Sequence, residues 1–459
     1  MFLGRKSELE QIKSLINSNK KHALMIYGKR RVGKSALIIE ALKDCDCKVI
    51  YYECLITSIA ENLRNLEKRV QDIFTNKYLH FESFKELFDF LGSCKEKVVV
   101  VLDEYSYLKK LAAENYVDSM FQSIIDQMHD NLSLVLLGSY VGIMKELLEK
   151  ENPLFGRFSL VINLKPFDYY DASLFYNKFK LQQKIDFYSV FGGSPFVCSF
   201  IEKKYTLEKN IINLLLNPDS VLRIYLENIL LAELSKLSNA NLILSALSNG
   251  KKRYSDLESS IGIKTNGNLD KQLKNLSDME IIGKVFPINK RDDKKKTFYE
   301  ISDNLVRFYY LYVFKNQDII AKIGGKTFFK EYIEPTLATF ISHRFEDIVR
   351  EFFSRCSRMG LEEKIQDIGT YWYDLPMEHK NGEFDCVVKR DTGYSVYEVK
   401  YYQKPLTKKE ADNEFKQVKA ITTDMLLDKV GFIALSGFDF TSKNYKLISA
   451  EELYNPSLE

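Results

Sequence analysis

Short apolar runs separated by longer, mixed stretches dominate the first part of the chain and predict a parallel sheet. The runs at 24–27, 98–102 and 132–137 are apolar without alternation, as strands buried on both faces are. A β-rich run at 47–56 and a last short run at 161–167 complete the set, and helical stretches lie between several of them. We therefore expect the chain to begin with an α/β domain.

The pattern changes in the second half of the chain. Residues 237–301 contain three helical stretches, a polar and charged connection, and a short strand, which is the order of a winged helix. After an amphipathic helix, the runs at 382–390 and 394–402 alternate apolar and polar residues, as the strands of a hairpin do. We expect four domains: an ATPase-like core at 1–165, a helical lid at 166–232, a winged helix at 233–325 and a C-terminal α/β domain at 326–459.

The turn after the first strand carries the clearest chemistry. It opens with Gly28 and closes with Gly33, Lys34 and Ser35, which is the full G-x-x-x-x-G-K-[ST] pattern between a strand and a helix. Glycines let the backbone approach phosphates, and the helix N-terminus attracts an anion. Lys34 is expected to reach the β and γ phosphates of ATP, and Ser35 to bind Mg²⁺. The predicted cofactor-binding residues here are Gly28, Lys29, Arg30, Arg31, Val32, Gly33, Lys34, Ser35 and Ala36.

A carboxylate pair follows the valine-rich strand. Asp103 and Glu104 stand at its carboxyl end, where open α/β sheets bind ligands. Asp103 is expected to bind Mg²⁺ through water, and Glu104 to polarise the attacking water. A charged strand end is common by accident, but its pairing with the glycine turn makes it a strong indication of ATP hydrolysis.

Composition limits the classes of protein that fit. The chain has 459 residues, 45% of them hydrophobic and 28% charged, with a net charge of +3, so a nucleic acid would have to bind a local basic patch. Seven scattered cysteines without a C-x-x-C pair argue against a zinc site and favour a reducing compartment. No signal region or membrane-spanning run is visible, so we expect a cytoplasmic protein without a membrane partner.

Residues 1 to about 230 resemble the archaeal-type ATPase family, a branch of the AAA+/STAND P-loop ATPases. The resemblance rests on the F-x-G-R opening at 2–5, GKRRVGKS, VVVVLDE, PLFGR and the GG-x-P turn at 192–195. It implies an ATP-binding domain with a helical lid. It also implies that Ser139, which ends a strand, senses the γ phosphate, although a strand-ending serine is more often a turn residue. Arg157 either supplies charge as an arginine finger, in its own or a neighbouring subunit, or is a surface residue.

The winged-helix region suggests a DNA partner. The connection between its last strands carries five basic residues, Lys290, Arg291, Lys294, Lys295 and Lys296. The third helix carries polar and basic residues, Asn266, Asn268, Lys271, Gln272 and Lys274. Basic side chains of this kind neutralise the phosphates of double-stranded DNA. Winged helices also bind proteins, so both partners stay open.

The C-terminal part resembles the PD-(D/E)xK nuclease fold, in the form fused to archaeal-type ATPases. Asp385 lies on one predicted strand, and Glu398 and Lys400 share a face of the next. The resemblance implies that Asp385, Glu398 and Glu346 bind Mg²⁺ or Mn²⁺ and that Lys400 orients the attacking water. Members of this fold also occur as scaffolds without catalysis.

These features together predict an ATPase whose nucleotide state controls DNA binding and metal-dependent DNA cleavage, with nucleotide-dependent self-assembly as a further expectation. The alternative is a STAND-type switch, in which the C-terminal domain only binds a partner. A small-molecule kinase fits less well, because the Asp103–Glu104 pair and the sensor-like strand replace a substrate lid.

Overall fold

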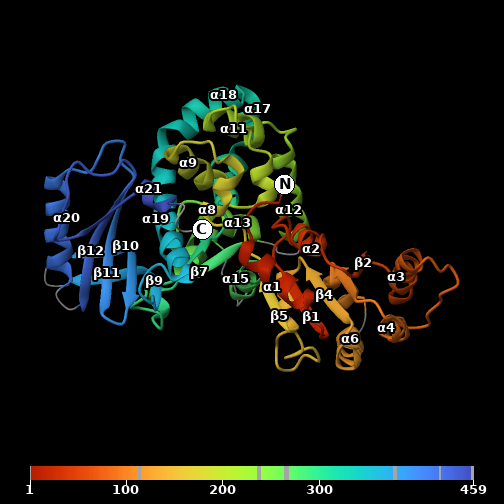
Figure 1. The fold of residues 1–459 in the computed structure, drawn as a ribbon. Coiled ribbons are helices and arrows are strands. Elements are labelled where there is room, and N and C mark those ends of the chain that lie inside the picture. The colour runs from red at the N-terminus through yellow and green to blue at the C-terminus, as the bar shows by residue number, and fades with distance from the viewer. Residues whose placement is uncertain are drawn as a thin grey trace. The chain divides into compact units, whose positions relative to one another are not determined.

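The computed structural model describes residues 2–111, 115–234, 239–262, 268–375, 380–422 and 425–455. The chain forms two compact units. One comprises Met1–Pro166 with Asp278–Glu280, and the other Phe167–Ser277 with Ile281–Glu459 (Figure 1). The four predicted domains stay a prediction, because the structure separates only these two units.

The first unit is built on a sheet of five strands. These are β1 (His22–Tyr27), β2 (Lys48–Glu53), β3 (Val98–Asp103), β4 (Leu132–Gly138) and β5 (Leu160–Asn163). Their order is β2-β3-β4-β1-β5, and every neighbouring pair is parallel. All residues of β3 and β4 are buried, as their unbroken apolar runs require. The predicted parallel sheet is thus confirmed.

Helices cover both faces of this sheet. They are α1 (Lys6–Asn17), α2 (Lys34–Leu42), α3 (Ile59–Phe74), α4 (Phe84–Ser93), α5 (Tyr105–Lys109), α6 (Tyr116–Gln127) and α7 (Val141–Glu146). One apolar core packs α1 and α2 against the sheet, and another packs α3, α4 and α6 against it. A disulfide joins Cys45 and Cys47 after α2, which the sequence analysis did not predict.

The second unit begins with short helices. They are α8 (Tyr169–Ser173), α9 (Leu181–Phe191), α10 (Pro195–Ser199), α11 (Leu207–Ile211) and α12 (Val221–Leu234). The predicted GG-x-P turn lies between α9 and α10. A Cβ at Gly193 would stand 1.8 Å from the carbonyl oxygen of Phe167, so only glycine fits there. The amide of Phe167 donates to the Gly193 carbonyl at 2.8 Å, which joins this turn to the start of the unit.

A small antiparallel sheet supports the predicted winged helix. Its strands are β6 (Lys252–Arg253), β7 (Ile282–Val285) and β8 (Phe298–Ile301), in the order β6-β8-β7. The helices are α13 (Ala240–Leu247), α14 (Tyr254–Ile261) and α15 (Asn268–Asp278). Asn266 and the side chain of Asn268 lie outside the described residues.

A mixed sheet forms the C-terminal part. After α16 (Asn304–Phe308), α17 (Gln317–Ile323) and α18 (Gly325–Phe328), the elements are α19 (Glu334–Met359), β9 (Asp367–Leu375), β10 (Lys380–Arg390), β11 (Gly393–Lys400), α20 (Lys408–Ile421), β12 (Leu427–Ala434), β13 (Lys446–Ser449) and α21 (Ala450–Leu453). The order is β13-β12-β11-β10-β9; β9, β10 and β11 are antiparallel, and β12 and β13 continue in parallel. The C-terminal part is thus a mixed α/β domain, and its likeness to a restriction endonuclease stays a prediction.

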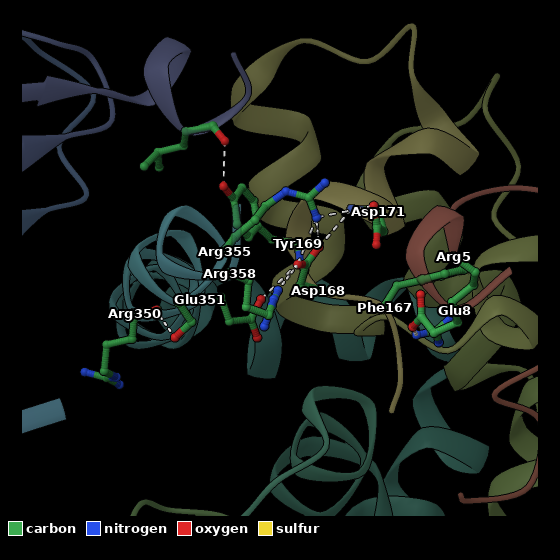
Figure 2. A network of polar contacts seen from close by, with 12 residues as sticks. Arg5, Glu8, Phe167, Asp168, Tyr169, Asp171, Arg350, Glu351, Arg355 and Arg358 are labelled. Carbon is green, nitrogen blue, oxygen red and sulfur yellow. Dashed lines mark hydrogen bonds and ion pairs between the residues drawn. The ribbon is translucent and has the colours of Figure 1, made fainter. Parts of the chain in front are cut away.

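Helix α19 connects this sheet to the start of the second unit through a buried polar network. Figure 2 shows Arg355 and Arg358 of α19 converging on Asp168, with N–O distances of 3.1 Å. One turn earlier, the Glu351 carboxylate accepts from the backbone amide of Tyr169 at 3.0 Å and from the Tyr188 hydroxyl at 2.9 Å. Burial, followed by the negative charge of Asp168, raises the pKa of Glu351 to about 8. The acid is therefore neutral at moderate pH.

This raised pKa predicts how the stability of the second unit depends on pH. Folded Glu351 holds a proton that unfolded glutamate releases above about 4.5, so the free energy of unfolding falls as pH rises from there to about 8. In Glu351→Gln the fall should be shallower by up to about 1.4 kcal/mol per pH unit. Urea unfolding, followed by fluorescence of the one tryptophan, Trp372, measures this. Glu363→Gln, at an exposed position, is the control, and equal slopes in all three proteins would contradict the assignment.

Candidate functional site

The glycine turn forms a closed loop around the Lys34 ammonium. Lys34 is 7% exposed, and its Nζ donates to the carbonyl oxygens of Gly28 and Lys29, both at 2.9 Å. Burial lowers the pKa of Lys34, while Glu104 and Asp103 act in the opposite direction. The loop thus holds a cation at its centre, where the sequence placed the phosphate chain.

Backbone geometry explains both glycines of the motif. At Gly28 a Cβ would lie 2.2 Å from the carbonyl oxygen of Leu164. Gly33 has a φ of 93° and directly precedes α2, whose first residues are Lys34 and Ser35. The amides at the start of α2 are therefore available to an anion, because the first turn of a helix leaves its N–H groups without partners in that helix.

Asp103 collects three donors at the end of β3. Ser35 Oγ donates to its carboxylate at 2.7 Å, the amide of Glu104 donates at 2.9 Å, and the hydroxyl of Tyr51 also donates to it. Tyr51 comes from the neighbouring strand β2, and burial together with Asp103 raises its pKa. Sequence reasoning missed Tyr51; the only signal was its place near the carboxyl end of a strand beside β3.

Glu104 is held by the residue predicted to sense the γ phosphate. Its Oε2 accepts from the Ser139 hydroxyl at 2.7 Å and from the Ser139 amide at 3.2 Å. The backbone of Glu104 is left-handed, with a φ of 54°, which is uncommon for a residue other than glycine and typical of functional sites. β3 and β4 are neighbours, so their carboxyl ends bring Glu104 and Ser139 together.

Arg30 adds a further cation to this edge of the sheet. Its guanidinium donates to the hydroxyls of Tyr107 at 3.1 Å and Tyr140 at 3.2 Å, and it lies 5.3 Å from the Tyr140 ring centre. The ammonium of Lys110 lies 3.4 Å from the centre of the same Tyr140 ring. The sequence analysis named Arg30 but not the tyrosines that hold it.

Arg157 lies in the first unit away from the glycine loop, and a role in a neighbouring subunit or a surface role stays a prediction. Its guanidinium binds both carboxylate oxygens of Asp126, at 3.0 and 3.1 Å. Asp126 stands at the end of α6, before β4 begins, and the Ser159 amide pairs with Ala23 at the start of β1. This is the amino edge of the sheet, opposite the glycine loop. Arg157 therefore does not reach the phosphate site of its own chain.

The residues at the carboxyl edge fit Mg²⁺ and a triphosphate. Ser35 and Asp103 present oxygen ligands, which a hard cation prefers, and Lys34 presents a positive charge. Glu104 has the carboxylate that a general base needs. The assembly matches what ATP hydrolysis requires.

A second group of ionisable residues lies in the C-terminal sheet. Cys386 of β10 pairs with Tyr397 of β11, and because the strands are antiparallel the preceding Asp385 stands opposite Glu398. A β-bulge between Phe384 and Val387 shifts the pairing of β10 with β9 at this position. Such bulges often re-aim a side chain beside a functional site.

Electrostatics tie Asp385 to its neighbours. Burial raises the pKa of Asp385 to about 7, and the charges of Glu346 and Glu398 add to the effect. Burial likewise raises the pKa of Glu398, and Lys400 opposes it. Carboxyl groups that raise each other's pKa favour a proton or a cation between them.

The predicted three-ligand metal site is not formed. In the described ranges of the chain, no group of three or more His, Cys, Asp or Glu side chains is placed to hold a metal ion. Two of the three predicted ligands have other partners: Glu398 pairs with Lys400 at 3.4 Å, and Glu346 with His343 at 3.4 Å. Lys400 also binds Glu414 of α20 at 3.0 Å, facing a small cavity of about 170 Å³ that Gln417 lines.

Two basic side chains of the predicted wing make contacts within the second unit. Arg291 pairs with Asp367, and the Lys296 ammonium lies 3.3 Å from the ring centre of Trp372, both on β9. The Ile288 amide donates to the Thr370 carbonyl at 2.8 Å, so this connection packs along β9. Lys290, Lys294 and Lys295 are exposed. On α15, Gln272 is buried, which corrects its expected place on a DNA-facing surface.

Comparison with known proteins assigns the N-terminal region. Residues 2–197 match an ATPase domain predominantly from Archaea. This match supports a nucleotide-binding ATPase. Residues 309–414, which include Asp385 and Lys400, match a family of archaeal and bacterial proteins of unknown function. No helix in the described part of the chain is long and apolar enough to cross a membrane.

Relatives and solved structures extend this comparison. An uncharacterised protein of Methanocaldococcus jannaschii is 28% identical over 85% of this chain and 85% of its own. An ATP-binding protein of the same organism is 46% identical over 44 residues, 10% of this chain and 75% of its own. The Walker-type ATPase of Pyrococcus abyssi is 22% identical, with a TM-score of 0.49, over 67% of this chain and 96% of that one. The ORC2 protein of Aeropyrum pernix is 15% identical, with a TM-score of 0.46, over 70% and 94%.

The buried position of Lys34 in the ATPase region predicts the effect of its removal. Lys34→Ala should weaken ATP binding by about 10- to 100-fold, because the phosphates lose a charge-assisted partner. Titration calorimetry measures the affinity. Lys43→Ala removes an exposed lysine just after α2 and should bind like the wild type. An unchanged affinity in Lys34→Ala would exclude this loop as the phosphate site.

Proposed function

We propose that the chain binds ATP with Mg²⁺ at the glycine loop, hydrolyses it, and uses its nucleotide state to control the C-terminal domain. The observation that carries the first part is the gathering of Lys34, Ser35, Asp103, Glu104 and Ser139 at one edge of the parallel sheet. Three separate sequence segments supply these residues, and only the ATPase fold brings them together.

Each side chain has a distinct task in this proposal. Lys34 and the amides at the start of α2 bind the phosphates, and Ser35 and Asp103 hold the metal ion, which when bound neutralises phosphate charge. Glu104 accepts the proton of the attacking water. For that task its carboxylate leaves the Ser139 hydroxyl, which then becomes able to donate to the γ phosphate.

Glu104→Gln tests the hydrolytic part. The amide cannot accept a proton, so turnover should fall by about 100-fold or more, while ATP still binds. Phosphate release measures turnover, and calorimetry measures binding. Glu53→Gln is the matched control, because Glu53 is exposed at the end of the adjacent strand and pairs in register with Asp103. Turnover at the wild-type rate in Glu104→Gln would remove Glu104 from the mechanism.

For the C-terminal domain, metal-dependent DNA cleavage is the function that Asp385 and Glu398 favour. The two carboxylates stand opposite each other on neighbouring strands, and Mg²⁺ is often bound by one or two carboxylates together with substrate phosphates. Lys400 follows on the same face as Glu398 and would donate to the charge that develops on the phosphate. Glu346 influences the charge of Asp385 from α19 rather than completing a three-ligand set.

A STAND-type switch with a C-terminal binding module is the second candidate. The ion pairs that hold Lys400 and Glu346 favour it, because they occupy the groups that cleavage needs. Nucleotide-dependent assembly without any cleavage would support the switch. Cleavage that requires Asp385 would support the nuclease.

Asp385→Asn tests the cleavage proposal. With linear double-stranded and single-stranded DNA offered as separate substrates in the presence of Mn²⁺, cleavage by Asp385→Asn should be more than about 100-fold slower than cleavage by the wild type, because the metal loses a charged ligand. Gel electrophoresis measures the products. Asp439→Asn removes an exposed carboxylate of the same domain and should cleave normally. Absence of metal-dependent cleavage by the wild type would leave the switch as the function of this domain.

A further inference from the structure

A large cavity opens beside Asp385 within the second unit. Its volume is about 760 Å³, within the range of about 300–1,000 Å³ typical of ligand pockets. Helix α19, strands β9 and β10, and the winged-helix region supply its walls. The cavity reaches well beyond the carboxylates, so a metal ion alone would leave most of it unused.

Two buried polar atoms in the cavity wall lack a partner. Arg307 is 4% exposed and Thr370 is 8% exposed, and both line the cavity. Among the described residues, neither Arg307 Nε nor Thr370 Oγ1 makes a hydrogen bond. The terminal nitrogen of Arg307 is already held by Glu300 at 3.1 Å, which fixes the direction of Nε. Both atoms are covered by neighbouring groups, so they mark polar positions just behind the wall and make this part of the wall the polar one.

Aromatic side chains form another part of the wall. Phe286, Tyr312 and Phe340 line the cavity, and the last two rings meet edge to face at 6.0 Å. Tyr312 is fixed by a hydrogen bond of 2.9 Å between its hydroxyl and Thr336. A flat, apolar group with a polar rim would satisfy such a wall.

Charges of both signs line the cavity. Arg307, Arg344 and Arg350 line it, and Asp347 pairs with the last two. The carboxylates of Glu346, Glu383 and Asp385 line it as well, and Arg350 donates to the carbonyl oxygen of Asp385. A ligand that carries both a phosphate and a bound cation matches this mixture of charges.

Exposed lysines continue outward from the cavity. Phe286 in its wall directly precedes the connection that carries Lys290, Lys294 and Lys295, and the Arg291 guanidinium lies 5.3 Å from the Phe286 ring centre. The connection also carries Asp292 and Asp293, but its five basic residues outnumber them, and this excess of positive charge suits a chain of phosphates.

We propose that the cavity binds one unpaired nucleotide of a DNA strand. The base lies against the aromatic wall, its polar edge meets Thr370 and Arg307, and the neighbouring phosphate lies toward Asp385. This inference deepens the proposed cleavage function by naming its substrate as DNA with an unpaired nucleotide. Paired bases would not enter, because a base within a duplex has both faces stacked.

Fluorescence anisotropy tests the binding separately from both enzymatic activities. The full chain carries Lys34→Ala to remove nucleotide binding at the glycine loop. Ca²⁺ replaces Mg²⁺ and Mn²⁺, so that a cation can lie between the phosphate and Asp385, and a gel confirms that the probe stays intact. The probes are a fluorescein-labelled single-stranded deoxyoligonucleotide of about 12 nucleotides and the blunt duplex of the same sequence. Thr370→Val and Phe286→Leu change the cavity, and Thr392→Val is the control, because Thr392 is exposed in the turn between β10 and β11.

The two probes should respond differently. Thr370→Val should weaken single-strand binding by about 3- to 10-fold and Phe286→Leu by about 10-fold, with duplex binding unchanged. Thr392→Val should bind both probes like the parent. Tight single-strand binding that neither cavity variant alters, or equal losses for both probes, would overturn the proposal. Thermal unfolding confirms that each variant is folded, and the half-buried Phe286 is the position that tolerates change best.

Cleavage data separate this inference from the proposed function. If the cavity variants weaken single-strand binding but the wild type never cleaves DNA, the cavity stands as a binding site and the nuclease proposal fails. If the wild type cleaves, Asp385→Asn does not, and the cavity variants bind normally, the nuclease stands and the cavity proposal fails.

Discussion

Charges removed from water must find partners, and this requirement shapes both units of the protein. Lys34 is enclosed by two carbonyl oxygens, and Asp103 by three donors. In the second unit, Asp347 lies between Arg344 and Arg350, and burial that would raise its pKa is outweighed by these arginines, which lower it to about 2. Lys34 and Asp103 lie at the ends of elements, whereas the Asp347 cluster lies within α19.

The two proposed sites differ in the groups that pair with their buried charges. At the glycine loop the cation is fixed by backbone carbonyls, which are weak partners that a triphosphate can replace. Beside Asp385 the carboxylates are paired with lysine and histidine side chains, and Asp385 itself has its pKa raised to about 7. A cation that binds there would compete with a proton on Asp385 and with those ion pairs. Cation binding at this site would therefore depend on pH.

Helix α19 relates the C-terminal site to the start of the second unit. Arg350 donates to the carbonyl of Asp385, and the next residue, Glu351, accepts from Tyr169 and Tyr188. Consecutive residues of one rigid helix therefore contact the carboxylate site and the segment that follows the ATPase sheet. Helix α19 therefore holds the carboxylate site and the start of the second unit against adjacent positions of one element.

Local sequence was enough for the elements and for the phosphate loop. Unbroken apolar runs determined the buried parallel strands, and the glycine spacing indicated the phosphate turn, because both signals depend on residues close in the chain. That only glycine fits at Gly28 was decided by the carbonyl of Leu164, which is far away in the sequence. The tertiary structure alone decided which charges meet: it placed Arg157 at the far edge of the sheet, Tyr51 on Asp103, and the predicted wing against β9. It also gave the carboxylates their separate cations and formed the cavity beside Asp385. Such pairings depend on distances between segments far apart in sequence, which no local pattern encodes.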